Sequence, residues 1–326
     1  MDVHISIIAD FKDTFRNVEI TDWCLSGHAW VFNRKQDTPL HINAQTWRSF
    51  NHEMIEKFHA AYDSFLSTFD FFIVGYASCF AMLYEKYNKP IVMLNAVRSD
   101  IPFCWSLNQP MLADYKACIR RVHDSGNLRI VSNSLADHLY TKAVLGIESV
   151  VIPSLCLYTG IRYDPRRCGL RFLCYNGAIP QHPLVVNRAA LRNFQWDAIA
   201  QFKGIIHFPY EPNTMSIFEH FSGGMPLFFP SKTYWKSHPN IQSISAYWGD
   251  KLPSELREFG DSSFWIESSD VYTTFASPNT YYFNSISHLF ELLQSFVYKD
   301  DRAFREAYIR TARETWTRTL GNIVSQ

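Results

Sequence analysis

The sequence predicts an α/β fold with two Rossmann-like, doubly wound domains. Short apolar runs rich in β-branched and aromatic residues recur along the chain, and most are followed by a segment with apolar residues at helical spacing. This alternation of strand and helix is typical of parallel sheets. A polar segment at 158–169 separates two groups of such units. The length of 326 residues is enough for two domains that each have their own core.

The first domain is expected over residues 1–160. Its predicted strands are residues 4–9, 18–23, 69–76, 90–95, 129–132 and 150–154. Its predicted helices are residues 47–65, 78–87, 110–123 and 135–145. The helix at 47–65 has the clearest pattern, because aromatic and aliphatic residues recur in it at spacings of three and four.

The second domain is expected over residues 161–300. Its predicted strands are residues 170–176, 204–208, 226–229 and an edge strand at 263–266. Its predicted helices are residues 184–194, a helix that begins at 215, and residues 286–298. A last helix is expected over 301–324, and its arginines are most simply interpreted as a solvated face.

The composition argues against several classes of protein. Lys+Arg and Asp+Glu both number 31, so the formal net charge is zero and no nucleic-acid partner is indicated. No apolar run approaches the ~18 to 20 residues of a membrane helix, and the start of the chain does not resemble a signal peptide. Seven cysteines without C-x-x-C spacing favour reduced thiols. We therefore expect a cytoplasmic protein, soluble or peripherally attached, and a homodimer is compatible with the sequence.

The most informative stretch is residues 209–226, which read PYEPNTMSIFEHFSGGMP. Two prolines stop the strand that precedes it. Asn213 or Thr214 can cap the following helix, and Gly223 and Gly224 end it. A helix N-terminus presents free N–H groups and a positive dipole end, which suit a phosphate. In open α/β sheets, ligands bind at the carboxyl ends of the strands.

Two carboxylates lie in this stretch. Glu211 would stand at the rim of the site and accept hydrogen bonds from a polyhydroxylated ligand, and Glu219 could reach a second pair of hydroxyls further along the helix. Two acids around an anion-binding helix end suit a nucleotide sugar. The simpler alternative is that Glu211 is a solvated carboxylate and Glu219 an exposed helix residue.

The spacing of these acids resembles the E-x7-E signature of family 4 glycosyltransferases, which are retaining enzymes of the GT-B fold. Residues 130–154 (IVSNSLADHLYTKAVLGIESVVIPS) also resemble the closing βαβ unit of that family's first domain, with Ser154 where Asn is usual. The resemblance implies a GT-B fold with a cleft between its two domains. It also implies that the last helix, residues 301–326, joins the first domain.

The resemblance assigns Glu211 to the donor sugar as the catalytic residue and Glu219 to the nucleotide ribose. It places the remaining donor-binding residues at Tyr210, Asn213, Thr214, Met215 and Ser216. It implies hexose transfer from a nucleotide sugar, GDP-mannose first and UDP-glucose second, to a glycan or glycoprotein acceptor. Enzymes of this family generally use protein cations rather than a metal, so no metal cofactor is expected.

Further cleft residues are expected in three places. The family often has a His after the strand that corresponds to 69–76, where this chain has Tyr76 and Ser78. It also has an Arg/Lys pair for the diphosphate after the first strand of the second domain, which this chain lacks. The candidates are therefore the loop residues Ser26, Gly27 and His28, the pair Tyr76 and Ser78, and the bases Arg188, Arg192 and Lys203.

Two alternatives remain open at the level of the sequence. One is another GT-B enzyme, such as a nucleotide-sugar epimerase or a phosphorylase. The other is a catalytically decayed GT-B protein that only binds a nucleotide sugar or a glycan. The absence of the Arg/Lys pair and of the His favours this second alternative. Hydrolysis of the donor without an acceptor would distinguish a transferase from a binding protein.

Overall fold

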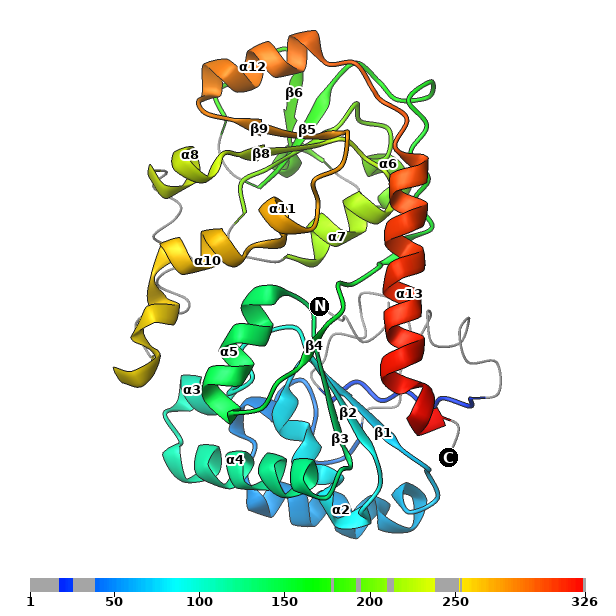
Figure 1. Cartoon of the computed structure of the whole chain (residues 1–326), viewed down its shortest axis with the longest axis vertical. Coiled ribbons are helices and arrows are strands. Elements are labelled where there is room, and N and C mark those ends of the chain that lie inside the picture. Colours follow the sequence, from blue (N-terminus) through cyan, green and yellow to red (C-terminus); the bar gives the residue numbers. More distant parts are fainter. Residues whose placement is uncertain are drawn as a thin grey trace. The chain divides into compact units, whose positions relative to one another are not determined.

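The structure is a computed structural model that describes residues 18–25, 39–176, 179–191, 195–209, 214–237, 252 and 254–324. The chain divides into two compact units (Figure 1). Unit 1 comprises Met1–Pro153 and Arg313–Gln326, and unit 2 comprises Ser154–Ala312. The segment at 158–169, expected as a linker, belongs to unit 2. The last helix α13 (Arg302–Val324) contributes residues to both units.

Unit 1 is built on a four-stranded parallel sheet, sheet A, with the strand order β1-β2-β3-β4. Its strands are β1 (Phe72–Gly75), β2 (Ile91–Asn95), β3 (Leu128–Ser132) and β4 (Val150–Val151). All five residues of β2 are buried. Full burial is expected of an inner strand in a parallel sheet, because connecting segments cover its faces.

The three longest helices of unit 1 that lie wholly within it begin where a side chain accepts a hydrogen bond from a free backbone amide. The helices described within unit 1 are η2 (Trp47–Ser49), α2 (His52–Leu66), η3 (Ser78–Leu83), η4 (Glu85–Tyr87), α3 (Phe103–Ser106), α4 (Gln109–Asp124) and α5 (Leu135–Leu145). Asn51, Asn108 and Ser134 are the N-caps of α2, α4 and α5, and each accepts a hydrogen bond from the amide three residues on.

Two predictions for unit 1 are wrong. Residues 18–23, predicted as a strand, have no regular secondary structure, because no ladder with a neighbouring strand is formed there among the described residues. Residues 78–87, predicted as one α-helix, form two 3-10 helices, because their backbone bonds span three residues and Asn88 then turns left-handed. The predicted strand at 4–9 and the loop of Ser26, Gly27 and His28 lie outside the described residues.

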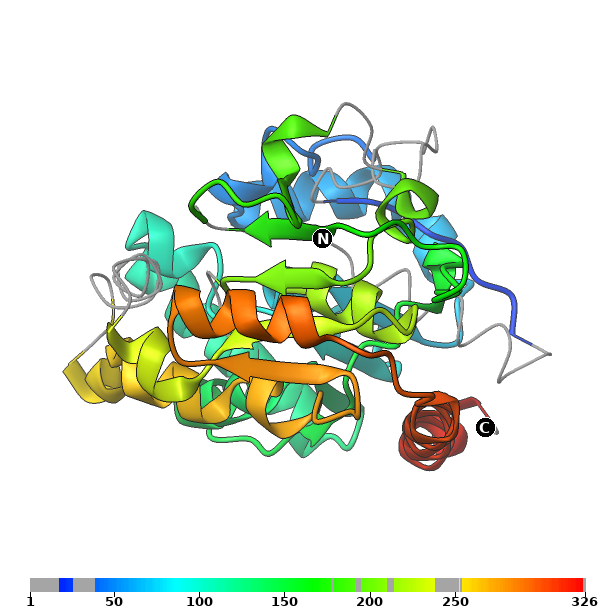
Figure 2. The same ribbon diagram turned by 90° about the horizontal axis from the view of Figure 1, so that it is seen from above.

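Unit 2 is built on a five-stranded parallel sheet, sheet B, with the strand order β6-β5-β7-β8-β9. Its strands are β5 (Phe172–Asn176), β6 (Val185–Asn187), β7 (Ile205–His207), β8 (Leu227–Pro230) and β9 (Thr280–Phe283). The strand arrows in Figure 2 run in the same direction. The chain passes from β5 to β6 on one side and then to β7 on the other, so the order reverses between β5 and β7.

The helices described within unit 2 are η5 (Leu157–Thr159), η6 (Arg188–Ala190), α6 (Trp196–Ile199), α7 (Met215–Ser222), α8 (Lys232–Ser237), η7 (Ser254–Gly260), α10 (Ser262–Ser268), α11 (Asp270–Thr273) and α12 (Ile286–Ser295). Helices of unit 2 lie on both faces of sheet B, with α12 on one face and α7 and α11 on the other (Figure 1). Ile217, Phe218 and Phe221 of α7 share one core cluster with Ile205 and Phe229. A second cluster packs α12 against the other face.

For unit 2, the structure corrects two predictions and adds one strand. Residues 184–194 were predicted as a helix, but the β-branched pair in β6 extends, and the described residues that follow, 188–191, contain only the short η6. Residues 263–266 were predicted as an edge strand, but they lie in α10, where Asp261 accepts from the amide of Ser263. β9 was not predicted and forms the edge of sheet B beside β8.

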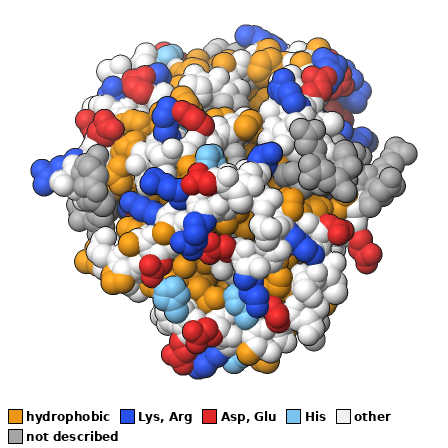
Figure 3. All heavy atoms as spheres, turned by 60° about the horizontal axis from the view of Figure 1, so that its bottom comes forward, with side chains coloured by type: hydrophobic (Ala, Val, Ile, Leu, Met, Phe, Trp, Pro, Cys, Tyr) orange, Lys and Arg blue, Asp and Glu red, His pale blue; other side chains and the backbone are white. Residues whose placement is uncertain are grey.

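Acidic and basic side chains are interspersed on the molecular face that Figure 3 displays. This mixture agrees with the formal net charge of zero. Among the described helices, none has the length and apolar character needed to cross a bilayer.

Candidate functional site

The candidate site lies at the carboxyl edge of sheet B, which we define as the ends of β5, β6 and β7 and the residues that follow them. β5 ends at Asn176 and β7 at His207, and the strand order reverses between these two strands. Open α/β sheets bind ligands at this position, because the connections leave in opposite directions and a crevice opens between them. Helix α7 follows β7 at this edge.

Helix α7 begins as the sequence predicts. Thr214 is the N-cap residue, with an extended backbone at φ −99° and ψ 138°. Its side chain makes no capping bond, and its Oγ1 lies 3.3 Å from Oγ of Ser216. Thr214 is buried, whereas Met215 and Ser216 are half-buried at the first turn. The first turn therefore offers the positive end of the helix dipole at the surface of the site.

The two glycines that end α7 permit close packing. A Cβ atom on Gly223 would lie 2.5 Å from Cγ2 of Ile161, and one on Gly224 would lie 2.5 Å from Cζ of Arg305. Gly224 also has φ +78°, which favours glycine. Gly223 thus lets the segment before β5 approach the end of α7, and Gly224 leaves room for the guanidinium of Arg305.

Glu219 is buried within unit 2, with only 3% of its surface exposed. The Tyr158 hydroxyl donates a hydrogen bond to its Oε1 over 2.6 Å. Burial raises the pKa of the Glu219 carboxyl, and hydrogen bonds from Tyr158 and Trp196 oppose this rise. The simpler interpretation of Glu219 as an exposed helix residue is therefore wrong.

Arg188 supplies a cation at the same edge. It follows β6 directly, and its Cζ lies 4.2 Å from the ring centroid of Tyr175 near the end of β5. Its charge also lowers the pKa of the Glu219 carboxyl, after the hydrogen bonds described above. A carboxylate and a guanidinium thus lie within electrostatic reach of each other beside α7.

Two histidines join α7 to the end of β7. Nε2 of His207 and Nδ1 of His220 are 2.9 Å apart and share a hydrogen bond, and both side chains are fully buried. Tyr175 packs edge-on against His220, and Phe229 stacks on His207. Burial lowers the pKa of both rings, that of His220 to about 3, and the charge of Arg188 adds to this effect.

Neither this histidine pair nor the roles of Tyr158, Tyr175 and Trp196 were predicted from the sequence. One signal was present. His207 is two residues from Ile205 in a strand, so both side chains lie on the same face of it, and His220 lies next to Glu219 on the following helix. The pairing itself depends on how α7 packs on sheet B, which the sequence does not specify.

Lys203 does not belong to this site, which corrects a prediction. It precedes β7, its amide donates to the carbonyl of Arg171 over 2.8 Å, and its Nζ lies over the rings of Phe172 and Phe296. These contacts put Lys203 at the amino edge of sheet B. Lys203 was a candidate because it is close in sequence to the site. A residue before a strand, however, lies at the opposite edge of a parallel sheet from a residue after one.

The other predicted site residues fall into two groups. Tyr76 and Ser78 belong to unit 1, where Tyr76 has φ +62° and the Ser78 hydroxyl donates to Oδ1 of Asn95 over 3.2 Å. The rest lie outside the described residues: Ser26, Gly27, His28, Arg192, Tyr210, Glu211 and Asn213.

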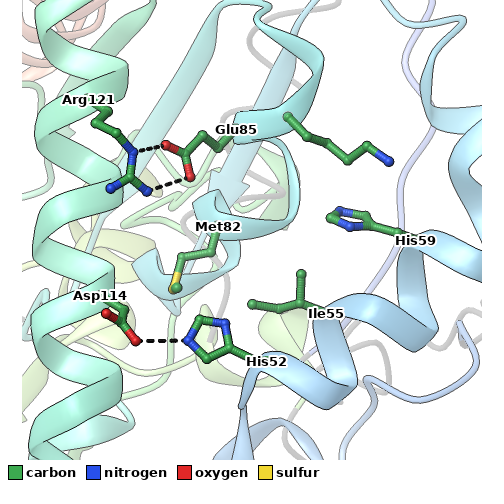
Figure 4. Close-up of a pocket in the computed structure, with 8 residues that line it drawn as sticks. His52, Ile55, His59, Met82, Glu85, Asp114 and Arg121 are labelled. Carbon is green, nitrogen blue, oxygen red and sulfur yellow. Dashed lines mark hydrogen bonds and ion pairs between the residues drawn. The ribbon is translucent and has the colours of Figure 1, made fainter.

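Unit 1 contains a separate hollow of about 430 Å³ between α2, the 3-10 helices η3 and η4, and α4 (Figure 4). His52 contacts Asp114 over 2.8 Å, and Arg121 makes two hydrogen bonds to Glu85, across the walls of the hollow. Met82 lies between these pairs. Because the acidic and basic groups are paired with each other, we do not place the functional site here.

Among the described residues, no group of three or more His, Cys, Asp or Glu side chains is arranged to hold a metal ion. Comparison with known proteins assigns no family to the chain. No family model matches it, and no match was found among curated proteins or solved structures. Its function therefore has to be inferred from the residues of the site.

Proposed function

We propose that this protein is a retaining glycosyltransferase of GT-B architecture and that unit 2 binds its nucleotide-sugar donor. One observation carries the proposal: Glu219 on α7 and Arg188 after β6 lie at the carboxyl edge of sheet B, beside the point between β5 and β7 where the strand order reverses. This acid belongs to the stretch that resembles the E-x7-E signature. An acid, a cation and a helix N-terminus at such an edge suit a ligand with hydroxyls and phosphates.

Each residue has a distinct part in this proposal. The first turn of α7, with Met215 and Ser216, faces phosphate or sugar oxygens. Arg188 holds the diphosphate, and Glu219 accepts hydrogen bonds from the ribose. Because the Tyr158 hydroxyl already donates to Glu219, a ribose hydroxyl would share or replace that bond. Glu211 contacts the donor sugar, as the resemblance implies.

The chemical step would depend on charge stabilisation. Negative charge develops on the leaving nucleoside diphosphate as the bond to the sugar breaks. Cations and helix dipoles that are already oriented stabilise such charge without reorganising during the reaction. Arg188 and the N-terminus of α7 supply these two elements.

A calorimetric panel of GDP-, UDP-, ADP- and dTDP-sugars tests the proposal. GDP-mannose is our first choice and UDP-glucose our second, because the resembled family contains many mannosyl- and glucosyltransferases. Slow release of nucleoside diphosphate without an acceptor should accompany binding. Absence of binding to every member of the panel at millimolar concentration would refute the proposed donor site.

The second candidate is a protein that binds a nucleotide sugar or glycan without catalysis. The position of Lys203 at the amino edge of sheet B favours it, since this leaves Arg188 without Lys203 as a second base for the diphosphate. Donor binding without hydrolysis or transfer would identify this function.

A further inference from the structure

The His207–His220 pair has a hydrogen-bonding imbalance that follows from its tautomers. A neutral imidazole carries one N–H. The ring that donates in the shared bond therefore has no proton on its outer nitrogen, the one that takes no part in that bond. The outer nitrogen of the other ring then carries a proton. These outer atoms are Nδ1 of His207 and Nε2 of His220, and both are buried without a partner among the described residues.

Adding a proton to this pair would make the imbalance worse. Both outer nitrogens would then be buried donors, and the charge would lie in a fully enclosed site. Three ionisable groups interact with the pair or lie beside it: the phenol of Tyr175 on β5, the cation of Arg188 after β6, and the carboxyl of Glu219 on α7. Arg188 repels a proton on either ring, and only an ionised Glu219 would attract one.

We propose that the His207–His220 pair is a protonation switch that releases α7 from sheet B in mild acid. The neutral pair holds the helix against the end of β7 through the shared bond, and a charged pair favours the open form, in which water solvates both rings. Met215, Ser216 and Glu219 are carried on the same helix, so release also removes the donor site. Only this last consequence rests on the proposed function.

The size of the effect follows from proton linkage. An imidazole that is neutral in the closed form and titrates near 6.5 in the open form raises the opening constant about thirtyfold between pH 7.5 and pH 5. Two such rings raise it up to about a thousandfold. Glu219 acts in the opposite direction, because its raised pKa means that the closed form takes up a proton first. The net effect is therefore smaller than the histidines alone would give.

The matched test replaces both rings by amides. His207→Gln puts an amide near the position of Nε2, and His220→Asn puts one near Nδ1, so the double variant H207Q/H220N keeps a hydrogen bond that cannot be protonated. Amide hydrogen exchange is measured on the protein without ligand and expressed as protection factors, which correct for the intrinsic pH dependence of exchange. Exposed His123, replaced by Gln, is the control.

In the wild type and the His123→Gln variant, the amides of α7 should lose at least tenfold in protection between pH 7.5 and pH 5. Those of α12, on the other face of sheet B, should keep theirs. In the double variant, α7 should lose less than threefold. Equal acid loss in wild type and double variant, or parallel loss in α7 and α12, would overturn the switch.

A second measurement on the wild type keeps the test valid if the double variant does not fold. Nitrogen chemical shifts of ¹⁵N-labelled histidine report the charge of each ring. The rings of His207 and His220 should become charged only over the pH range in which α7 loses protection. Protonation of both rings while α7 stays protected would refute the proposal, and because no ligand is present this result would leave the donor-site proposal untouched.

Discussion

At the scale of single residues, the structure excludes the simpler alternative for Glu219, an exposed helix residue, and shows a buried carboxyl with a hydrogen-bond donor. Its Oε1 accepts from Tyr158 over 2.6 Å, and it is almost fully enclosed. The identity of Glu219 as a candidate followed from its spacing to Glu211. Its partner could not be predicted, because Tyr158 lies 61 positions away in η5. Contacts between such distant segments depend on tertiary packing.

Removing the Tyr158 hydroxyl should destabilise unit 2. A hydrogen bond to a charged group contributes about 1.5 to 3 kcal/mol, so Tyr158→Phe should lower the free energy of unfolding by that amount at neutral pH. The loss should be smaller at acid pH. The raised pKa means that Glu219 of the folded state is protonated there, and a neutral carboxyl gains less from the Tyr158 hydroxyl than a carboxylate does. Denaturant unfolding at several pH values measures this.

Tyr281→Phe is the matched control, since its hydroxyl lies 3.5 Å from its acceptor, the Val297 carbonyl, at an exposed position. That change should stay within about 0.5 kcal/mol. Equal losses of unfolding free energy in the two variants would show that the Tyr158–Glu219 hydrogen bond contributes no more than an exposed tyrosine hydroxyl does.

The two acids should differ in kinetics. Glu219 is assigned to the ribose, remote from the bond that breaks, so Glu219→Ala should raise KM for the donor about tenfold to a hundredfold with kcat little changed. Glu211 is assigned to the reacting sugar, so Glu211→Ala should lower kcat by at least as large a factor. Steady-state kinetics measures both, after circular dichroism has established that each variant is folded. The reverse pattern would exchange the two roles.

At the scale of elements, α7 was predictable and its neighbours were less so. Its start and end follow from local signals, the cap position of Thr214 and the glycine pair, and the structure confirms both. β6 and α10 were misassigned because runs of three or four apolar residues fit either a strand or a helix. Such short segments take the conformation that their packing partners require.

Gly223 should not tolerate a side chain, because Ile161 lies too close to it. A Cβ atom there would lie 2.5 Å from Cγ2 and 2.8 Å from Cβ of Ile161. Gly223→Ala should therefore cost about 1 to 3 kcal/mol through overpacking. Adding Ile161→Ala should cost less in the Gly223→Ala background than in the wild type, as a double-mutant cycle of unfolding free energies would reveal.

Gly321 in α13 is the matched control, because nothing lies within 4 Å of a Cβ atom built on it. Gly321→Ala should be stabilising by about 0.5 to 1 kcal/mol, as expected within a helix. If Gly223→Ala is equally stabilising, the close approach of Ile161 to α7 is wrong.

At the scale of the whole molecule, the repeated alternation of strand and helix correctly predicted two parallel sheets. The strand orders could not be read in this way, because an alternation does not reveal on which side each new strand joins. The error at Lys203 has a different cause: Arg188 follows a strand and Lys203 precedes one, so in a parallel sheet they lie at opposite edges. For the molecule as a whole, we propose that the carboxyl edge of this sheet binds a nucleoside diphosphate group.

The most direct test compares the two bases by calorimetry with GDP and UDP. Arg188→Met keeps an apolar stem on Tyr175 but removes the charge, and should weaken nucleoside diphosphate binding about tenfold to a hundredfold, the loss of ~1.5 to 3 kcal/mol. Lys203→Met makes the same change at the amino edge and should leave the affinity within about twofold. Equal affinities for Arg188→Met and the wild type, or a larger loss for Lys203→Met, would contradict the proposed site.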